Sequence, residues 1–214
     1  MMETDEKILA MRNELREKII YPEKNIDKKT LEKELTSSIY DDKVNVFGKT
    51  KIFEDKVLFN NLISLRVPSD FNYLDEEIIQ RIYPMGNPPQ IVLSDETDYF
   101  FSVGLSYLDY NLPEIGLKKY VQNIWTALDR LGPKTGFIKL EMIKSKDNTP
   151  IAVLEFTSLA IDTAVYNIQF HASIQGKVLM GTINFPFSRK ERLVPLVREI
   201  IISLKNLTKK EEII

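Results

Sequence analysis

Four segments of alternating side chains follow one another in the second half of the chain, and no helical pattern separates them. They read FIKLEMIK (Phe137–Lys144), IAVLEFTS (Ile151–Ser158), AVYNIQFH (Ala164–His171) and KVLMGTIN (Lys177–Asn184). Side chains of a strand point alternately to two faces, and Gln175-Gly176 fits the turn between the last two segments. In the third segment Tyr166 and Phe170 share one face, whereas His171 lies on the other. The stretch therefore predicts neighbouring strands of one sheet.

Helical patterns precede and follow these strands in the sequence. Before them, apolar residues recur at helical spacing until a glycine and a proline end the helix: Leu117, Val121, Ile124, Leu128 and Leu131, then Gly132 and Pro133. After them, Ser188 and Glu191 form a capping-box pattern for a last helix, in which Pro195 predicts a kink or a loose first turn. Strands that run together with helices at the ends predict an α+β fold, with an antiparallel sheet flanked by helices in an α/β/α sandwich.

Shorter elements are expected between residues 44 and 107. Strands are predicted at 44–48, 51–53, 57–59 and 62–67, with a turn at Asn60-Asn61 between the last two. A short helix is predicted after Asp75 and stops at Pro84, and residues 86–89 form a rigid loop. Residues 90–94 and 99–107 predict a hairpin.

The composition of the chain changes near residue 43. The first 43 residues contain 20 charged side chains but only two aromatic ones, so they can bury less apolar surface than the rest. Narrow apolar stripes predict two helices there, one that ends before Pro22 and one that includes Ile39. We therefore expect a charged helical extension, residues 1–43, and an α+β domain, residues 44–214. The extension either packs on the domain or forms an arm that binds a partner or a second copy.

The composition disfavours several classes of function. The 214 residues include no cysteine and one histidine, which argues against thiolate or multi-histidine metal sites, so we expect no metal and no cofactor. A net charge of −2 argues against nucleic acid as a partner. The chain does not open with a secretory signal pattern, and no apolar run is long enough to span a membrane. We expect a cytoplasmic protein.

No arrangement of residues in the sequence indicates a catalytic centre. His171 has no nucleophile or orienting carboxylate in its local sequence, so we expect it to be an exposed or half-exposed sheet residue. Residues 95–98 include three carboxylates but lack the ligand spacing of a calcium loop, and they fit a solvated hairpin turn. The sequence also lacks a glycine-rich phosphate loop and a nucleophile elbow. These observations favour a non-enzymatic protein.

Four short phrases stand in a fixed order along the chain: Val67-Pro68-Ser69-Asp70-Phe71, Tyr83-Pro84-Met85-Gly86-Asn87-Pro88-Pro89-Gln90, Ala160-Ile161-Asp162-Thr163-Ala164-Val165-Tyr166-Asn167 and Gly176-Lys177. Over residues 50–206 this order resembles the bacterial branch of the PsbP-like superfamily, which includes the Ran-binding Mog proteins and the effector-associated chaperones of type VI secretion. The resemblance implies an antiparallel sheet with helices on its faces and a protein that binds other proteins. It implies no catalytic residue.

These observations predict a non-enzymatic protein-binding module, an adaptor or chaperone for another protein such as a secreted effector. We place its binding surface on the sheet face opposite the aromatic one. The candidate residues on that surface are Lys139, Glu141, Asn167, Gln169 and His171. Two alternatives stay open, namely a carrier of a small apolar ligand between the sheet and a helix, and an enzyme that gathers scattered carboxylates and lysines. A homodimer is compatible with this prediction.

Overall fold

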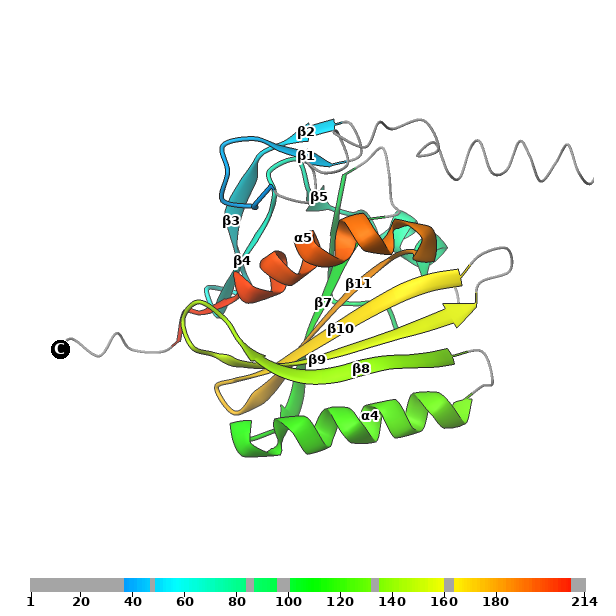
Figure 1. Ribbon diagram of the computed structural model, residues 1–214. Helices are drawn as coiled ribbons and strands as arrows, with labels where there is room; N and C mark the ends of the chain where they lie inside the picture. The colour runs from blue at the N-terminus through cyan, green and yellow to red at the C-terminus, as the bar shows by residue number, and fades with distance from the viewer. Residues whose placement is uncertain are drawn as a thin grey trace, which may run out of the picture. The chain divides into compact units, whose positions relative to one another are not determined.

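The computed structural model describes residues 37–46, 49–83, 87–95, 101–131, 135–159 and 164–208 (Figure 1). The strands are β1 (Val44–Val46), β2 (Lys49–Lys51), β3 (Phe53–Leu58), β4 (Ile63–Pro68), β5 (Asn72–Tyr73), β6 (Ile91–Ser94), β7 (Ser102–Asn111), β8 (Thr135–Lys144), β9 (Pro150–Leu159), β10 (Ala164–Ile174), β11 (Lys177–Pro186) and β12 (Lys205–Asn206). The α-helices are α3 (Glu76–Ile82), α4 (Leu117–Leu131) and α5 (Lys190–Ile202). Within these ranges, no helix has the length and apolar character needed to cross a membrane.

Seven strands form one antiparallel sheet in the order β5-β6-β7-β11-β10-β9-β8. The four alternating segments of the sequence are confirmed as β8 to β11, and each pairs with the next. The β10–β11 hairpin turns through Gln175 and Gly176, whose φ angles of 51° and 76° are typical of a tight two-residue turn. Because β7 pairs with the far side of β11, β5 and β8 become the two edges of the sheet.

One face of this sheet carries the main apolar core beneath α5 (Figure 1). Tyr166 and Phe170 of β10 lie on this face and belong to the same buried cluster as Val197 and Ile200 of α5. The Phe170 ring lies over Gly181 of β11, where a Cβ atom would come within 2.0 Å of the ring. Glycine is therefore required at this position for close packing of the ring on the sheet.

The opposite face of the sheet is covered by α4. Leu117 and Val121 of α4 belong to a second buried cluster together with Leu154 and Phe156 of β9. Figure 1 shows α4 and α5 on opposite faces of the sheet. The predicted α+β fold, an antiparallel sheet between helices, is therefore confirmed, and neither face is left open over β9 and β10.

Two smaller sheets complete the described structure. β12, β4 and β3 form a three-stranded sheet in that order, and β1 pairs with β2. The strand pair predicted around Asn60-Asn61 is confirmed as β3 and β4, whose residues pair from Phe53 with Pro68 to Leu58 with Ile63. This pair belongs to the three-stranded sheet and not to the main one.

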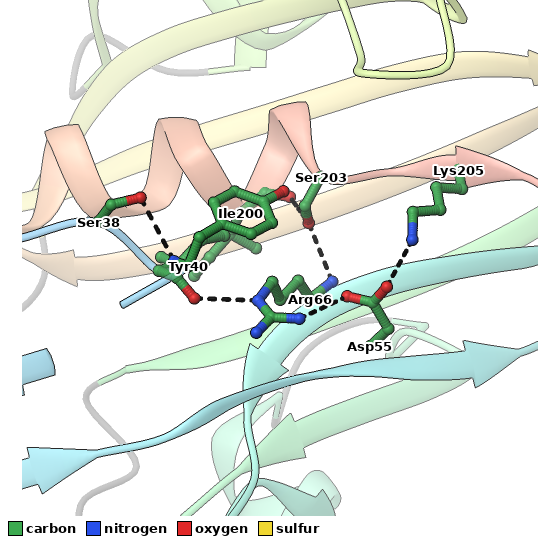
Figure 2. Close-up of polar contacts among 8 residues, drawn as sticks. Ser38, Tyr40, Asp55, Arg66, Ile200, Ser203 and Lys205 are labelled. Carbon is green, nitrogen blue, oxygen red and sulfur yellow. Dashed lines mark hydrogen bonds and ion pairs between the residues drawn. The ribbon is translucent and has the colours of Figure 1, made fainter. Parts of the chain in front are cut away.

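Residues 37–43, which we assigned to the extension, contact the α+β domain. Ile39 is fully buried in the main core and lies in a turn, not in the predicted helix. The Glu199 carboxylate accepts hydrogen bonds from the Ile39 amide (2.7 Å) and from Ser38 Oγ (2.9 Å), and Arg66 Nε donates to the Ile39 carbonyl (2.9 Å). Figure 2 shows Arg66 paired also with Asp55. The helices expected in residues 1–36 lie outside the described residues, and the division at residue 43 stays a prediction.

The predicted capping box of the last helix is wrong. A 3-10 turn, Phe187–Arg189, precedes α5, so Ser188 lies before the helix start and is exposed. The N-cap of α5 is Arg189, which makes no side-chain cap hydrogen bond. Pro195 lies inside α5 as expected. The helix begins one residue later than the capping pattern indicated because the tighter 3-10 turn comes first.

Candidate binding surfaces

The five residues predicted to form one binding surface lie on both faces of the sheet. Lys139 and Glu141 of β8 are on the same face as Glu155 of β9, which is the α5 face. Asn167, Gln169 and His171 lie on the α4 face, as alternation from Tyr166 requires. The prediction that all five share an open face is therefore wrong.

His171 is the clearest correction, because it is 0% exposed. Its ring meets that of Tyr120 of α4 edge to face, with 5.8 Å between the ring centroids. Burial lowers the pKa of His171 to about 4, so the ring is neutral at pH 7. Neither ring nitrogen has a hydrogen-bond partner among the described residues. A neutral ring under a helix with no carboxylate bonded to it cannot act as an accessible general base.

Asn167 and Gln169 are also withdrawn from the surface. The Asn167 side chain is buried and donates a hydrogen bond to Ser158 Oγ (2.9 Å) of the neighbouring strand. The Gln169 side-chain oxygen is buried and has no partner among the described residues. Both residues follow the predicted alternation, but α4 covers the face to which they point.

Lys139 and Glu141 belong to a charged cluster between β8 and α5. Arg198 of α5 bonds to both Glu141 and Glu155, and the Lys139 ammonium lies 3.5 Å from each of these carboxylates. The Tyr166 hydroxyl donates a hydrogen bond to Glu155, which is 1% exposed. Two cations thus balance two carboxylates, and the cluster fastens α5 to the β8 edge.

The pKa values in this cluster agree with a structural role. Burial and then the nearby Glu155 carboxylate raise the pKa of Tyr166, so its hydroxyl keeps its proton and donates it. Burial alone would raise the pKa of Glu141, but the Arg198 hydrogen bond and charge outweigh it and lower that pKa. Tyr166 is therefore protonated and Glu141 ionised at neutral pH, which is not the arrangement of an acid–base pair.

The β8 edge itself presents apolar side chains to solvent. Phe137, Ile138 and Met142 are 50%, 39% and 40% exposed. Phe137 also contacts Trp125 of α4, with 5.1 Å between ring centroids. The register of β8 on β9 slips between Phe137 and Lys139, so Ile138 forms a bulge. Among the described residues, β9 is the only strand that pairs with β8.

A hollow of about 550 Å³ lies at the other edge of the sheet, beside β5. The end of β3, the turn that follows it, β5 and the start of β6 supply its walls: Val57, Leu58, Phe59, Asn60, Asn61, Tyr73, Gln90 and Ile91. Val57 and Tyr73 stand at its exposed side, with 49% and 57% of their surfaces open to solvent. The hollow therefore joins the three-stranded sheet to the main sheet.

Backbone geometry holds this hollow in shape. Phe59, Asn60 and Asn61 all have positive φ angles, of 51°, 53° and 67°, a rare conformation for three successive residues that are not glycine. Gln90 fixes the opposite wall, because its side chain accepts a hydrogen bond from the Tyr107 amide (2.9 Å) and donates one to the Tyr107 carbonyl (3.2 Å). The Phe59 ring lies 6.1 Å from the Tyr107 ring.

The hollow can bind but lacks the groups for acid–base chemistry. Its eight lining residues include three carboxamides and the phenol of Tyr73, but no carboxylate, imidazole, ammonium or guanidinium. The sequence signal for it was the Asn60-Asn61 turn, which predicted the bend but not what would face it. Glu155 and Arg198 were likewise missed, because only the fold brings them together from β9 and α5.

The comparisons with known proteins show the fold. No family model and no curated protein sequence matches the chain. The solution structure of cyanobacterial PsbP (CyanoP) from Synechocystis sp. PCC 6803 is similar over 76% of this chain and 96% of its own, with a TM-score of 0.54 and 13% identity. A protein from Bacteroides thetaiotaomicron (TM-score 0.46, 14% identity, 74% of this chain and 49% of its own) and a Pseudomonas aeruginosa protein of unknown function (0.41, 12%, 71% and 94%) are less similar. The chain has an α+β fold of the PsbP-like kind.

Proposed function

We propose that the protein is a non-enzymatic binding module, an adaptor or chaperone, that docks an extended, uncharged segment of another protein in the hollow beside β5. The observation that carries this proposal is the hollow itself, with Tyr73 and Val57 exposed at its side and no ionisable group other than a phenol in its lining. The PsbP-like fold is compatible with the proposal but does not select it.

Three features of the hollow favour an extended segment as the occupant. β5 has β6 as its only strand partner within the described ranges, so its outer backbone groups can pair with an added strand. The side chains of Asn60 and Asn61 are exposed and can bond to peptide groups. Val57 and Ile91 offer apolar contact for one side chain of the segment. A charged segment would find no opposite charge in the lining.

The alternative of a small apolar ligand has weaker support. The region between the sheet and α4, where we expected such a ligand, is filled by buried side chains such as Leu117, Val121 and Phe156. The hollow beside β5 is open and carries polar carboxamides, whereas apolar ligands are held in enclosed, mostly apolar cavities. Native mass spectrometry would detect a tightly bound ligand as added mass, and we expect none.

The proposal is tested by site-specific photocrosslinking in the protein's own cells. A benzophenone amino acid replaces Tyr73 in one variant and Tyr110 in the other, because these two tyrosines are similarly exposed, at 57% and 54%. We expect a defined crosslinked protein from position 73 that is absent from position 110. Its binding to the purified chain is then measured directly.

Substitutions at the hollow give the quantitative test. Val57→Ser should weaken binding of the captured partner at least tenfold, whereas Ile52→Ser, at an equally exposed position next to β3, should not. Circular dichroism confirms that both variants fold. Equal binding by the two variants, or an identical crosslink pattern from positions 73 and 110, would exclude the hollow as the docking site.

A further inference from the structure

A second surface, at the opposite edge of the sheet, has a pattern of its own. β8 is ten residues long and exposes Phe137, Ile138 and Met142, and among the described residues its outer edge pairs with no strand. A long open edge with exposed apolar side chains is a template for pairing with another strand. This inference does not depend on the proposed function, because the hollow lies at the β5 edge.

We propose that two copies of this chain associate through their β8 strands, antiparallel to each other, around a two-fold axis at Leu140. In this register Lys139 lies opposite the partner's Glu141, and Glu141 lies opposite the partner's Lys139. At the axis itself, Leu140 faces the partner's Leu140. Basic residues thus meet acidic ones and apolar residues meet apolar ones, and directly opposite pairs of these kinds stabilise antiparallel strands.

Other registers of the same two strands are unfavourable. Because side chains alternate between two faces, a two-fold antiparallel pair can slide only in steps of two residues if the faces are to match. One such step places Lys139 opposite the partner's Lys139, and a step the other way places Glu141 opposite the partner's Glu141. Like charges directly opposite destabilise the pair. The charges of β8 therefore select one register and one kind of partner, a second copy.

The surroundings of Lys139 and Glu141 allow Lys139 to pair with the partner's Glu141 instead of with the carboxylates of its own chain. Lys139 is the more open member of its cluster, with 42% of its side chain exposed, and lies at 3.5 Å from Glu141 and Glu155. Arg198 bonds directly to both carboxylates and keeps Glu155 paired when Lys139 turns to the partner. A lysine and a bulge on an edge strand normally discourage pairing with unrelated strands. Here they leave the self-complementary register as the favourable one.

Charge reversal tests this register. Light scattering during gel filtration of the full chain should give twice the 24.8 kDa mass of one chain. Lys139→Glu and Glu141→Lys should each give monomers, because each places like charges opposite each other. A mixture of the two variants should form heterodimers, because each position then faces its opposite charge. Monomeric wild-type protein, or dimers of both single variants as strong as those of the wild type, would overturn the proposal.

A single cysteine locates the axis. The chain has no cysteine, so the thiol of a Leu140→Cys variant can form a disulfide only with the same thiol of a second copy. Residues on the axis of an antiparallel pair are close enough for this bond, and we expect rapid oxidation to a covalent dimer. Thr126→Cys, at an exposed position on α4, is the control and should stay monomeric. Equal crosslinking of both variants, or a Leu140→Cys chain that folds but does not crosslink, would exclude the β8 interface.

Discussion

The two edges of the seven-stranded sheet are built in opposite ways. β8 is ten residues long and carries both charged and exposed apolar side chains. It is fastened to α5 by Arg198, which bonds to Glu141 of β8 and to the buried Glu155 of β9. β5 is two residues long and borders a neutral hollow that is shaped by a left-handed turn and by Gln90. A long edge needs charges to restrict its pairing, whereas a short edge can bind through a hollow beside it. The stability of the β8 edge should therefore depend on the buried charges, and the shape of the hollow beside β5 should depend on the local backbone.

The largest effect is expected where the β8 edge is fastened. Glu155→Leu should lower the free energy of unfolding by about 3–5 kcal/mol, because the buried Tyr166 hydroxyl loses its acceptor and the half-buried Arg198 keeps only Glu141 as a carboxylate partner. Urea denaturation at pH 7 measures this loss. The double variant Glu155→Leu with Tyr166→Phe should recover part of it, since no buried hydroxyl then lacks a partner. A loss as small as that of an exposed ion pair would mean that the cluster does not fasten the edge.

Acid should weaken the α4 side of the molecule next. The unfolded chain takes up a proton at His171 near pH 6.5, whereas burial lowers the pKa of His171 in the folded protein to about 4. The contribution of His171 to the free energy of unfolding is therefore complete above pH 6.5, and about 3 kcal/mol of it is lost as the pH drops to 4. His171→Leu should remove this part of the pH dependence, and the difference between the two unfolding curves isolates it from the carboxylates. Parallel curves from pH 7 to pH 4 would contradict the burial of a neutral ring.

Glycine substitutions compare an inner strand with the β8 edge. At Gly104 of β7, a Cβ atom would lie 2.7 Å from Pro89 Cγ, so Gly104→Ala should cost about 1–3 kcal/mol and move Gln90, which follows Pro89 and lines the hollow. At Gly136 of β8 the Cβ atom would meet the end of the Thr157 side chain at 2.6 Å, and a hydroxyl can rotate away. Gly136→Ala should therefore cost less. Thermal unfolding of the two variants checks the order, and the reverse order would show that Pro89 is not held rigidly over the sheet.

The smallest effect on stability is expected at the exposed tyrosines. Tyr73→Ala and Tyr110→Ala should each change the free energy of unfolding by less than about 1 kcal/mol, because both side chains are more than half exposed. Only Tyr73→Ala should reduce partner binding, which a titration with the crosslinked partner measures. A large loss of stability from Tyr73→Ala would mean that this residue holds the hollow together and does not contact a partner.

The alternation of β10 shows how far sequence reasoning reaches. It correctly separated Tyr166 and Phe170 from Asn167 and His171, because side-chain direction follows from the local backbone of a strand. It failed on exposure, because the polar character of one face suggested solvent whereas α4 covers that face with Tyr120. In β8, regular alternation placed Lys139 and Glu141 on the wrong face, because the bulge at Ile138 shifts the register and changes the face to which the next side chains point.

The sequence by itself determined the class of fold and most of the elements, since the periods of strands and helices, the turn at Gln175-Gly176 and the helix-ending Gly132-Pro133 are local properties of the chain. The tertiary structure alone decided which face α4 covers, which strands become the edges, and how Glu155 meets Arg198 and Asn60 meets the β5 edge. These contacts join residues far apart in the sequence. No local period encodes them, because they depend on how complete elements pack against one another.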